Sequence, residues 1–229
     1  MQQKARRNKI LTRDNAFMWA FLIVGMSVQV VTFLITKQTV LSLVCGLLGI
    51  CSVILCSQGN ILTFAFGFAQ ILTYSYICYK ESLYGTLAIN AYYFITQIYG
   101  VYVWRKRLKD DNKDIAESVP TRHLSMRFIA IMSVLLIVCS YITGLCLSHF
   151  TNDSQPYLDA FTTVPALLAQ VLMILAYREQ WYIWFLIDVL YVVLWARAGD
   201  YCLFAQHIFW CVNCIYGYIH WSKTLQERV

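Results

Sequence analysis

The chain has 229 residues, of which 59% are apolar and 13% are charged. Soluble globular proteins carry about 25% charged residues, so this composition excludes an ordinary soluble domain. A helix of roughly 20 apolar residues spans a bilayer, and several such segments follow one another here, separated by short polar breaks. We therefore expect a polytopic membrane protein.

Eight apolar segments with few charges predict eight transmembrane helices. In chain order they cover residues 17–35, 40–56, 61–79, 83–104, 128–147, 158–177, 181–195 and 201–221. A membrane β-barrel would instead show segments of about ten residues with alternating polarity. The expected fold class is all-α integral membrane, because a helix satisfies its own backbone polar groups in lipid.

The basic residues predict how these segments are oriented. Of the 18 Lys and Arg residues, 15 lie in the N-terminal stretch, in the loop 105–127, at Arg178 or in the C-terminal tail. Lys37, Lys80 and Arg197 are the other three. The positive-inside rule then places both termini in the cytoplasm. The net charge of +6 reflects this topology and contact with anionic lipid, and it gives no reason to expect a nucleic-acid partner.

The nine cysteines lie within or at the edges of the apolar segments, where they are interpreted as small packing residues. Cys211 and Cys214 form a CxxC pair, but a single pair inside a helix is weak evidence for metal or redox chemistry. We expect neither a metal site nor a cofactor.

An internal repeat is visible at an offset of 117 residues. The run Ile98-Tyr99-Gly100-x3-Trp104 reappears as Ile215-Tyr216-Gly217-x3-Trp221, and Tyr74 corresponds to Tyr191. Each repeat contains three helices, and three is an odd number, so one extra helix between them restores the same orientation to both. Parallel repeats of this kind are typical of transporters whose substrate site lies near the bilayer midplane.

The repeat divides the chain into four parts: a basic N-terminus with an extra helix (1–38), repeat 1 (39–104), a basic loop with a linker helix (105–157), and repeat 2 with the tail (158–229). The architecture is thus expected to be 3+1+3 with parallel repeats, plus one N-terminal helix.

Asp188 is the strongest candidate for a binding residue. A carboxylate near the centre of a membrane helix costs on the order of 3 kcal/mol to insert, so it normally faces a cavity or a partner. Trp181, Trp184, Asp188 and Tyr191 follow at i, i+3, i+7 and i+10, a spacing that puts all four on one helix face. This face suits a flat ring, above all a cationic one. In the alternative interpretation, Trp181 belongs to an interfacial aromatic belt and Asp188 pairs with a polar neighbour.

Other polar residues in the apolar segments add candidate contacts. Gln70 aligns with Asp188 at an offset of 118, one residue out of phase with the repeat. Side-chain amides donate and accept hydrogen bonds without adding charge, which suits a carboxamide or a sugar. The alternative is that they only join helices. These candidate substrate-binding residues are Gln70, Asn90, Tyr93, Gln97, His207 and Asn213.

Two residues of the sixth segment are candidates for movement. Pro165 frees a backbone carbonyl and allows a bend, which suits a hinge in an alternating-access carrier, although tolerated kinks are common in membrane helices. Asp159 lies near the outer end of the same segment, as a gate residue or a solvated cap.

These motifs resemble the PnuC family of bacterial nicotinamide riboside transporters. The resemblance rests on Trp181-x2-Trp184-x3-Asp188, where the family pattern ends in Asn or Asp, on Phe66-Gly67-x2-Gln70, and on Asn90 with Gln97-Ile98-Tyr99-Gly100-x3-Trp104. It extends from about residue 40 to residue 221 and leaves the first helix outside.

The resemblance implies a 3+1+3 fold similar to the SWEET sugar transporters, a homotrimer in the bacterial inner membrane, and uptake of nicotinamide riboside by facilitated diffusion. Phosphorylation by a cytoplasmic nucleoside kinase would then trap the substrate for NAD biosynthesis. Relatives with thiamine, riboflavin or deoxynucleosides as substrates are the alternative that helix patterns separate poorly.

Two other classes of protein are less well supported. A membrane enzyme is not expected, because HExxH, GxSxG and phosphate-binding glycine loops are missing from the sequence. A receptor or scaffold would bind a ligand without transport, and the internal repeat favours transport.

Overall fold

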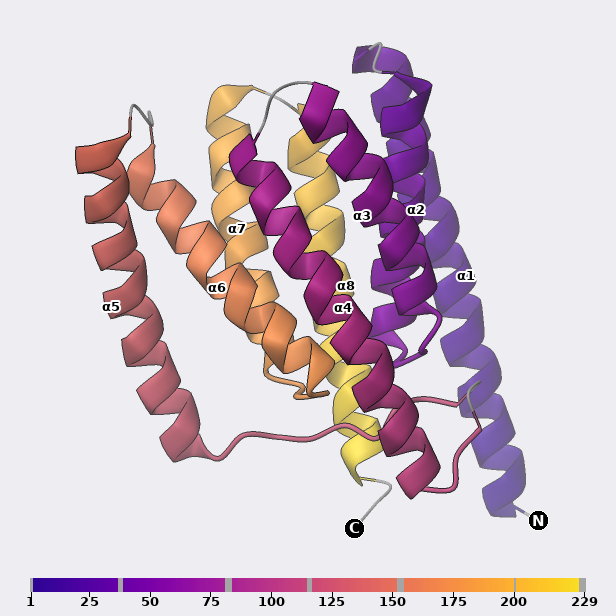
Figure 1. Ribbon diagram of the computed structural model, residues 1–229. Coiled ribbons are helices and arrows are strands. Elements are labelled where there is room, and N and C mark those ends of the chain that lie inside the picture. The colour runs from indigo at the N-terminus through magenta and orange to yellow at the C-terminus, as the bar shows by residue number, and fades with distance from the viewer. Residues whose placement is uncertain are drawn as a thin grey trace.

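The computed structural model describes residues 2–36, 39–80, 84–114, 117–151, 155–199 and 201–226, with the backbone alone for 2–17, 84–86, 198, 201 and 202. These residues form a bundle of eight α-helices, in agreement with the all-α prediction (Figure 1). The helices are α1 (Gln2–Thr36), α2 (Val40–Ser57), α3 (Thr63–Lys80), α4 (Tyr84–Asp110), α5 (Met126–Phe150), α6 (Pro156–Ile174), α7 (Gln180–Ala198) and α8 (Tyr201–Gln226).

Each predicted segment coincides with one helix, and the main differences lie at the ends. Helix α1 begins at Gln2 and α4 continues to Asp110, whereas the apolar stretches begin at 17 and stop at 104. Both extensions are polar. A hydropathy pattern detects only the part of a helix that suits lipid, so the hydrated ends were missed.

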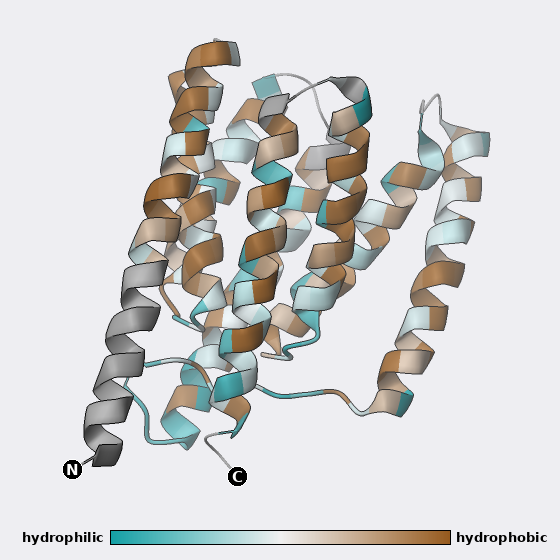
Figure 2. Ribbon diagram, turned by 180° about the vertical axis from the view of Figure 1, so that it is seen from behind, coloured by the Kyte–Doolittle hydropathy of each residue, from teal (hydrophilic) through white to brown (hydrophobic). Residues whose placement is uncertain are grey.

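The surface of the bundle is apolar along much of its length, which identifies a membrane protein. Four helices of the described chain are long and apolar enough to cross a bilayer: Met18–Thr36, Val40–Ser57, Met126–Phe150 and Pro156–Ile174. Phe128, Leu135 and Tyr141 of α5 are each more than half exposed, as expected for lipid contact. Figure 2 shows apolar residues along the helices and hydrophilic ones in the connections at one end.

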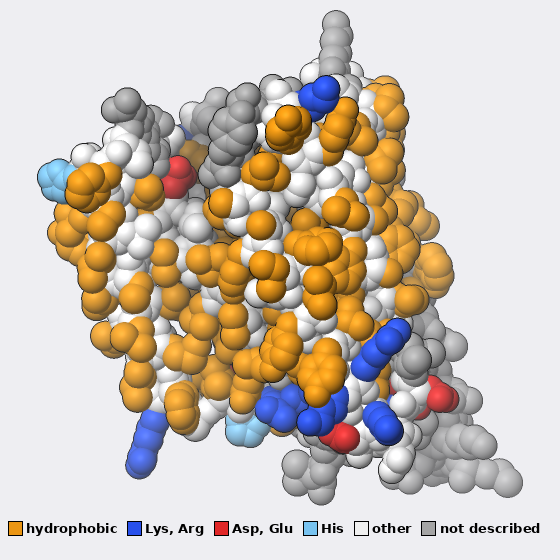
Figure 3. All heavy atoms as spheres, viewed as in Figure 1, with side chains coloured by type: hydrophobic (Ala, Val, Ile, Leu, Met, Phe, Trp, Pro, Cys, Tyr) orange, Lys and Arg blue, Asp and Glu red, His pale blue; other side chains and the backbone are white. Residues whose placement is uncertain are grey.

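That end of the bundle is also basic. Helix α1 begins there, α8 ends there, and the connection between α4 and α5 crosses it (Figure 1). Most Lys and Arg side chains visible in Figure 3 gather at this end. We call it the basic end. At the opposite end, Lys80 and Arg197 lie in the last turns of α3 and α7, while Lys37 lies outside the described residues.

The helices divide into a central group and two peripheral ones. Helix α5 packs against α6 alone among the described helices, and α1 packs against α2 and α8. The central contacts join α2 with α3, α3 with α4, α6 with α7, and α7 with α8. The six central helices include all the candidate binding residues.

Two turns at the basic end have the same geometry at an offset of 117 residues. Gly59 N donates to Cys56 O at 2.8 Å after α2, and Ala176 N donates to Met173 O at 2.9 Å after α6. Gly59 and Ala176 also have similar positive φ angles, 68° and 59°. A positive φ is uncommon for alanine, so the shared conformation indicates a geometry that both turns require.

The two repeated tryptophans bond across the bundle in matching ways. Trp104 Nε1 donates to Met173 O at 3.3 Å and to Ile174 O at 3.1 Å, and Trp221 Nε1 donates to Cys56 O, the counterpart of Met173 O, at 3.0 Å. Both side chains are 0% exposed. Each indole thus ties its own helix to the end of the first helix in the other half of the sequence.

This offset of 117 continues into the start of α3 and α7, where Phe64 N–Ile61 O is matched by Trp181 N–Arg178 O. Counting on along both helices, Asp188 corresponds to Ile71, not to Gln70. The expected equivalence of Gln70 and Asp188 required an offset of 118, and the turns do not follow that offset.

Candidate functional site

A cavity of about 580 Å³ lies between α2, α3, α4, α6, α7 and α8. All ten residues that the sequence analysis selected for substrate binding line it: Gln70, Asn90, Tyr93, Gln97, Trp181, Trp184, Asp188, Tyr191, His207 and Asn213. They come from four different helices. Its lining also includes Ser52, Cys56, Gln170, Gln180, Trp210 and Cys214, which were not selected.

Asp188 lies at the centre of a small polar cluster between α7 and α8. Its Oδ1 lies 3.0 Å from Nδ1 of His207, and Cys214 Sγ donates to its Oδ2 at 3.7 Å. The His207 ring stacks on Tyr191, with 4.8 Å between ring centroids and 23° between planes. The Asp188 carboxylate thus pairs with a polar neighbour and also faces the cavity, so the two interpretations of this residue are compatible.

The two tryptophans of α7 occupy different surroundings. Trp181 is 3% exposed and meets Trp221 edge to face, at 5.7 Å and 89°. Its ring lies over Gly217, where an added Cβ atom would be 2.5 Å from Trp181 Cε2. Trp184 is only partly buried and packs against the buried core that contains Trp181 and Trp221. Trp181 therefore forms the buried floor of the cavity, and Trp184 is the more accessible of the two lining indoles.

The same close approach explains the glycine of the repeated motif. A Cβ atom added at Gly100 would lie 2.4 Å from Phe64 Cε1, and Phe64 meets Trp104 edge to face at 5.0 Å. Phe64 and Trp181 are equivalent at the offset of 117. Each IYG run supplies a glycine because an aromatic ring from the neighbouring helix lies directly against its backbone.

Several buried polar groups in the cavity wall have no hydrogen-bond partner within the described part of the chain. They are both amide atoms of Asn213 and of Gln180, Oε1 of Gln97 and Nε1 of Trp181. A buried polar group left unpaired costs about 1–3 kcal/mol. A bound molecule or water that pairs with these groups removes that cost, so the cavity is suited to a ligand with several polar atoms.

Other polar residues of the cavity are already bonded within the protein. Asn90 Nδ2 donates to Cys78 Sγ at 3.9 Å, and Gln170 Nε2 donates to Thr96 Oγ1 at 3.4 Å. These contacts agree with the interpretation of some amides as links between helices.

The cavity is closed at the basic end by the three tryptophans Trp104, Trp181 and Trp221, which we call the tryptophan cluster. Trp221 meets both others edge to face, with Trp104 at 6.0 Å and 62°. All three are at most 3% exposed. Of the three, Trp181 lines the cavity, and Trp221 packs against it from behind.

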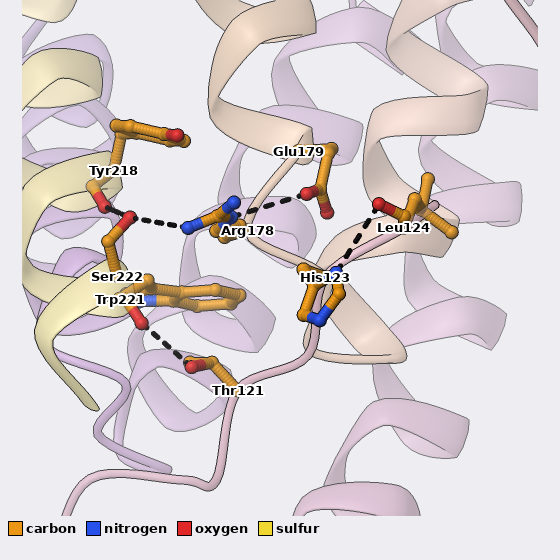
Figure 4. A network of polar contacts seen from close by, with 8 residues as sticks. All are labelled: Thr121, His123, Leu124, Arg178, Glu179, Tyr218, Trp221 and Ser222. Atoms are coloured by element: carbon orange, nitrogen blue, oxygen red, sulfur yellow. Dashed lines mark hydrogen bonds and ion pairs between the residues drawn. The ribbon is translucent and has the colours of Figure 1, made fainter. Parts of the chain in front are cut away.

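Residues 118–122, between α4 and α5, run beneath the tryptophan cluster and are called the strap. Val119 N donates to Gly59 O at 2.9 Å, and Arg122 N donates to Ala176 O at 2.7 Å. Thr121 Oγ1 donates to Trp221 O at 2.8 Å, as Figure 4 shows. The strap therefore binds the two equivalent turns in the same manner and ties them to α8.

Arg178 holds the α6–α7 turn against α8 beside the strap. Its Nη1 donates to Ser222 Oγ at 3.3 Å, and its Nε lies 3.3 Å from Glu179 Oε1 (Figure 4). In the sequence analysis Arg178 was considered only for its charge, whereas its side chain also joins the α6–α7 turn to α8 at the basic end.

The two residues proposed for movement lie outside the cavity lining. Pro165 is inside α6, which is assigned as one helix from Pro156 to Ile174. Asp159 lies exposed in the first turn of α6, where a carboxylate interacts favourably with the helix dipole. The hinge at Pro165 and the gate at Asp159 stay predictions.

Comparisons with known proteins identify the family of the chain. A family model described as nicotinamide mononucleotide transporter matches residues 39–223. The chain is 29% identical to the nicotinamide riboside transporter PnuC of Neisseria mucosa over 221 residues, covering 92% of this chain and 81% of that protein. It is also 29% identical to PnuC of Haemophilus influenzae over 201 residues, or 87% and 86% of the two chains.

A solved structure titled "Crystal structure of the Vitamin B3 transporter PnuC" superposes with a TM-score of 0.75. The match is at 29% identity and covers 93% of each chain. The family model begins at residue 39, which leaves α1 outside it, as the sequence resemblance did.

Proposed function

Because the chain belongs to the nicotinamide mononucleotide transporter family, we propose that it carries nicotinamide riboside across a bacterial inner membrane. The main support for this substrate is the cavity, which combines the partly exposed Trp184 ring, the Asp188 carboxylate and amides without a hydrogen-bond partner. A pyridinium ring over an indole gains about 2 kcal/mol when desolvated. The curated relatives are named for the same substrate.

The charges of the cavity favour the riboside over the mononucleotide. The described lining residues include the Asp188 carboxylate and no Lys or Arg. A phosphate group would enter near a carboxylate with no cation to offset its charge, which is costly away from water. Nicotinamide mononucleotide therefore serves as the negative control in any binding assay.

A second candidate substrate is another vitamin or nucleoside. Thiamine is also cationic, and Asp188 offers it the same counter-charge, while riboflavin and deoxynucleosides lack that attraction. A calorimetric titration with all four ligands separates these possibilities.

The proposed architecture is the 3+1+3 arrangement, with α2–α4 and α6–α8 as parallel repeats, α5 as the linker and α1 as an addition. The matched turns and the matched indole bonds support it. All eight helices would cross the membrane, with the basic end and both termini in the cytoplasm, and the family resemblance adds a homotrimer.

Transport is proposed to be facilitated diffusion, with trapping by a cytoplasmic nucleoside kinase. The protein is reconstituted without kinase into sealed vesicles, and labelled nicotinamide riboside is added outside. We expect the internal concentration to rise to the external one and to stop there, with or without an imposed proton or sodium gradient.

Empty vesicles and nicotinamide mononucleotide are the controls. Internal substrate above the external concentration under a gradient would show ion coupling and contradict facilitated diffusion. Binding without flux would favour the receptor class.

Release into the cytoplasm is proposed to require opening of the tryptophan cluster and the strap. Trp104→Phe and Trp221→Phe keep an aromatic ring and each remove a bond across the bundle, worth about 0.5–1.5 kcal/mol. Each variant should raise the rate at which a maleimide labels Cys56 from the cytoplasmic side roughly 2- to 10-fold. Labelling is followed by mass spectrometry of the Cys56 peptide in inverted vesicles.

The matched control is Trp19→Phe, since Trp19 lies on α1 and is 58% exposed. Its labelling rate should equal that of the wild type. Unchanged labelling in both cluster variants would mean that the indole bonds do not hold this end closed. Pro165 is the proposed hinge of the same movement, and Asp159 the proposed gate at the opposite end.

A further inference from the structure

Gln180, the first residue of α7, occupies an unusual position in the cavity wall. The residue is 0% exposed, and its polar neighbour is the Cys56 thiol, a weak hydrogen-bond group, while neither Nε2 nor Oε1 has an oxygen or nitrogen partner within the described part of the chain. It lines the same cavity as Trp184 and Asp188. A buried side chain whose donor and acceptor have at most a thiol as partner costs free energy to bury.

The equivalent residue in the other half of the sequence is bonded within the protein. At the offset of 117, Gln180 corresponds to Thr63, whose Oγ1 donates to Ser52 O at 2.8 Å. Ser52 Oγ donates in return to Thr63 O at 2.9 Å. The pair Thr63–Ser52 thus joins α2 to α3 through the two side chains.

The matching pair in α6 and α7 is broken. Ser52 corresponds to Ala169, which is 0% exposed and has no side-chain donor or acceptor. Gln180 therefore occupies the position of a helix-joining residue, but α6 offers it no side-chain partner there. Its longer amide reaches into the cavity without the partner that Thr63 has.

The spacing along α7 indicates which part of a ligand this amide would meet. Asp188 is eight residues beyond Gln180, a rise of about 12 Å, and Trp184 lies midway on the same face. Nicotinamide riboside carries its ribose on ring atom N1 and its carboxamide on ring atom C3, so the two substituents leave the cationic ring in different directions. A ring stacked on Trp184 with its ribose toward Asp188 and His207 would direct the carboxamide toward Gln180.

We propose that Gln180 binds the carboxamide of the substrate and determines specificity for it, with the carboxamide at the floor of the cavity and the ribose toward Asp188. A primary carboxamide offers one donor group and one acceptor, the same complement as the glutamine side chain, so the two form paired hydrogen bonds. This inference rests on the proposed function. It adds the orientation of the ligand and the residue that recognises the carboxamide on its ring.

The test compares two ligands, nicotinamide riboside and the pyridinium riboside that lacks the carboxamide. In calorimetry, we expect the wild-type protein to bind nicotinamide riboside roughly 3- to 10-fold more tightly, because the pyridinium riboside cannot form the hydrogen bonds of the carboxamide. Gln180→Met has nearly the same size and no amide, and it should bind both ligands equally. A variant that keeps the wild-type preference would overturn the proposal.

Thermal unfolding without ligand provides an independent readout. Gln180→Met replaces an unpaired buried amide with an apolar group, so its Tm should equal or exceed that of the wild type. The control Tyr92→Phe loses the bond from Tyr92 Oη to Leu167 O at 2.9 Å, outside the cavity lining, so its Tm should fall while its preference for the carboxamide stays. A Tm loss in Gln180→Met as large as that of Tyr92→Phe would reveal a structural partner and overturn the proposal.

The two proposals fail in different ways. If the wild-type protein binds neither ligand, the proposed function fails, and the inference fails with it. If the wild type binds nicotinamide riboside but Gln180→Met keeps the preference, the inference alone fails.

Discussion

Replacing Asp188 with asparagine should weaken the binding of nicotinamide riboside roughly tenfold or more, while its uncharged dihydro form loses less than about threefold. The reason is charge: two opposite unit charges about 4 Å apart attract by about 4 kcal/mol at an effective dielectric constant of 20, before desolvation costs are subtracted. The substitution keeps the shape of the side chain and leaves Oδ1 to accept from His207 Nδ1, now 3.0 Å away. Calorimetric titration of both ligands measures the difference.

Comparing the two ligands also shows whether the Asp188–His207 pair carries a net charge. A neutral imidazole that donates from Nδ1 leaves the pair with one negative charge, which attracts the pyridinium. Equal losses for both ligands would show that the pair presents no net charge to the substrate. Asp110→Asn is the matched control, since Asp110 is an exposed residue at the end of α4, and its affinity for both ligands should be unchanged.

The amide, acidic and histidine residues among the ten were predictable because a polar side chain in an apolar helix is costly and therefore informative, and the aromatic ones because their spacing puts them on the same helix faces. Asn90, Gln97, Asp188 and Asn213 each interrupt an apolar stretch, and all of them line the cavity. The helices were predictable for a related reason, since lipid selects long apolar segments. Composition and spacing were sufficient wherever the membrane itself imposes the pattern.

Other site residues had no such signal. Gln180 follows Arg178 and Glu179 and lies just before the predicted segment 181–195, although it is the first residue of α7. Trp210 is one aromatic residue among many in α8. Cys214 was read as a packing residue, and its contact with Asp188 depends on how α7 and α8 pack. These roles arise from tertiary contacts.

The strap was also beyond the sequence, because its main contacts are backbone hydrogen bonds. Val119 and Arg122 bond through their amide N–H groups, which every residue except proline has. Nothing in their side chains distinguishes them from neighbouring loop residues.

The two halves of the chain agree at the closed end and differ in the cavity. Trp104 and Trp221, like Gly100 and Gly217, keep the same residue because each half must seal against the other in the same way. In the cavity, Ile71 corresponds to Asp188. The contacts between the two halves can be symmetric. A ligand that carries a ribose and a carboxamide is not symmetric, so the residues that bind it must differ between the two halves. The asymmetry therefore lies where the substrate is proposed to bind.

Replacing Trp184 with alanine should weaken the binding of nicotinamide riboside by roughly 10- to 100-fold. Stacking of a base on an aromatic side chain contributes about 1–3 kcal/mol by alanine substitution, and a desolvated cation over an indole adds to it. Trp184 is partly exposed to the cavity, so its removal enlarges the cavity more than it disturbs the core. Calorimetry and vesicle flux should show parallel losses, and Trp184→Phe should recover part of the affinity.

Two matched variants separate binding from folding. Trp19→Ala removes an indole that is 58% exposed on α1, and it should leave affinity unchanged. Trp181→Ala removes an indole that is 3% exposed and packed on Gly217 and Trp221, so it should lower Tm, because truncating a buried tryptophan costs about 3–5 kcal/mol. If Trp184→Ala keeps its affinity within about twofold, against the stacking energy expected, the indole is not the stacking face and the substrate ring lies elsewhere in the cavity.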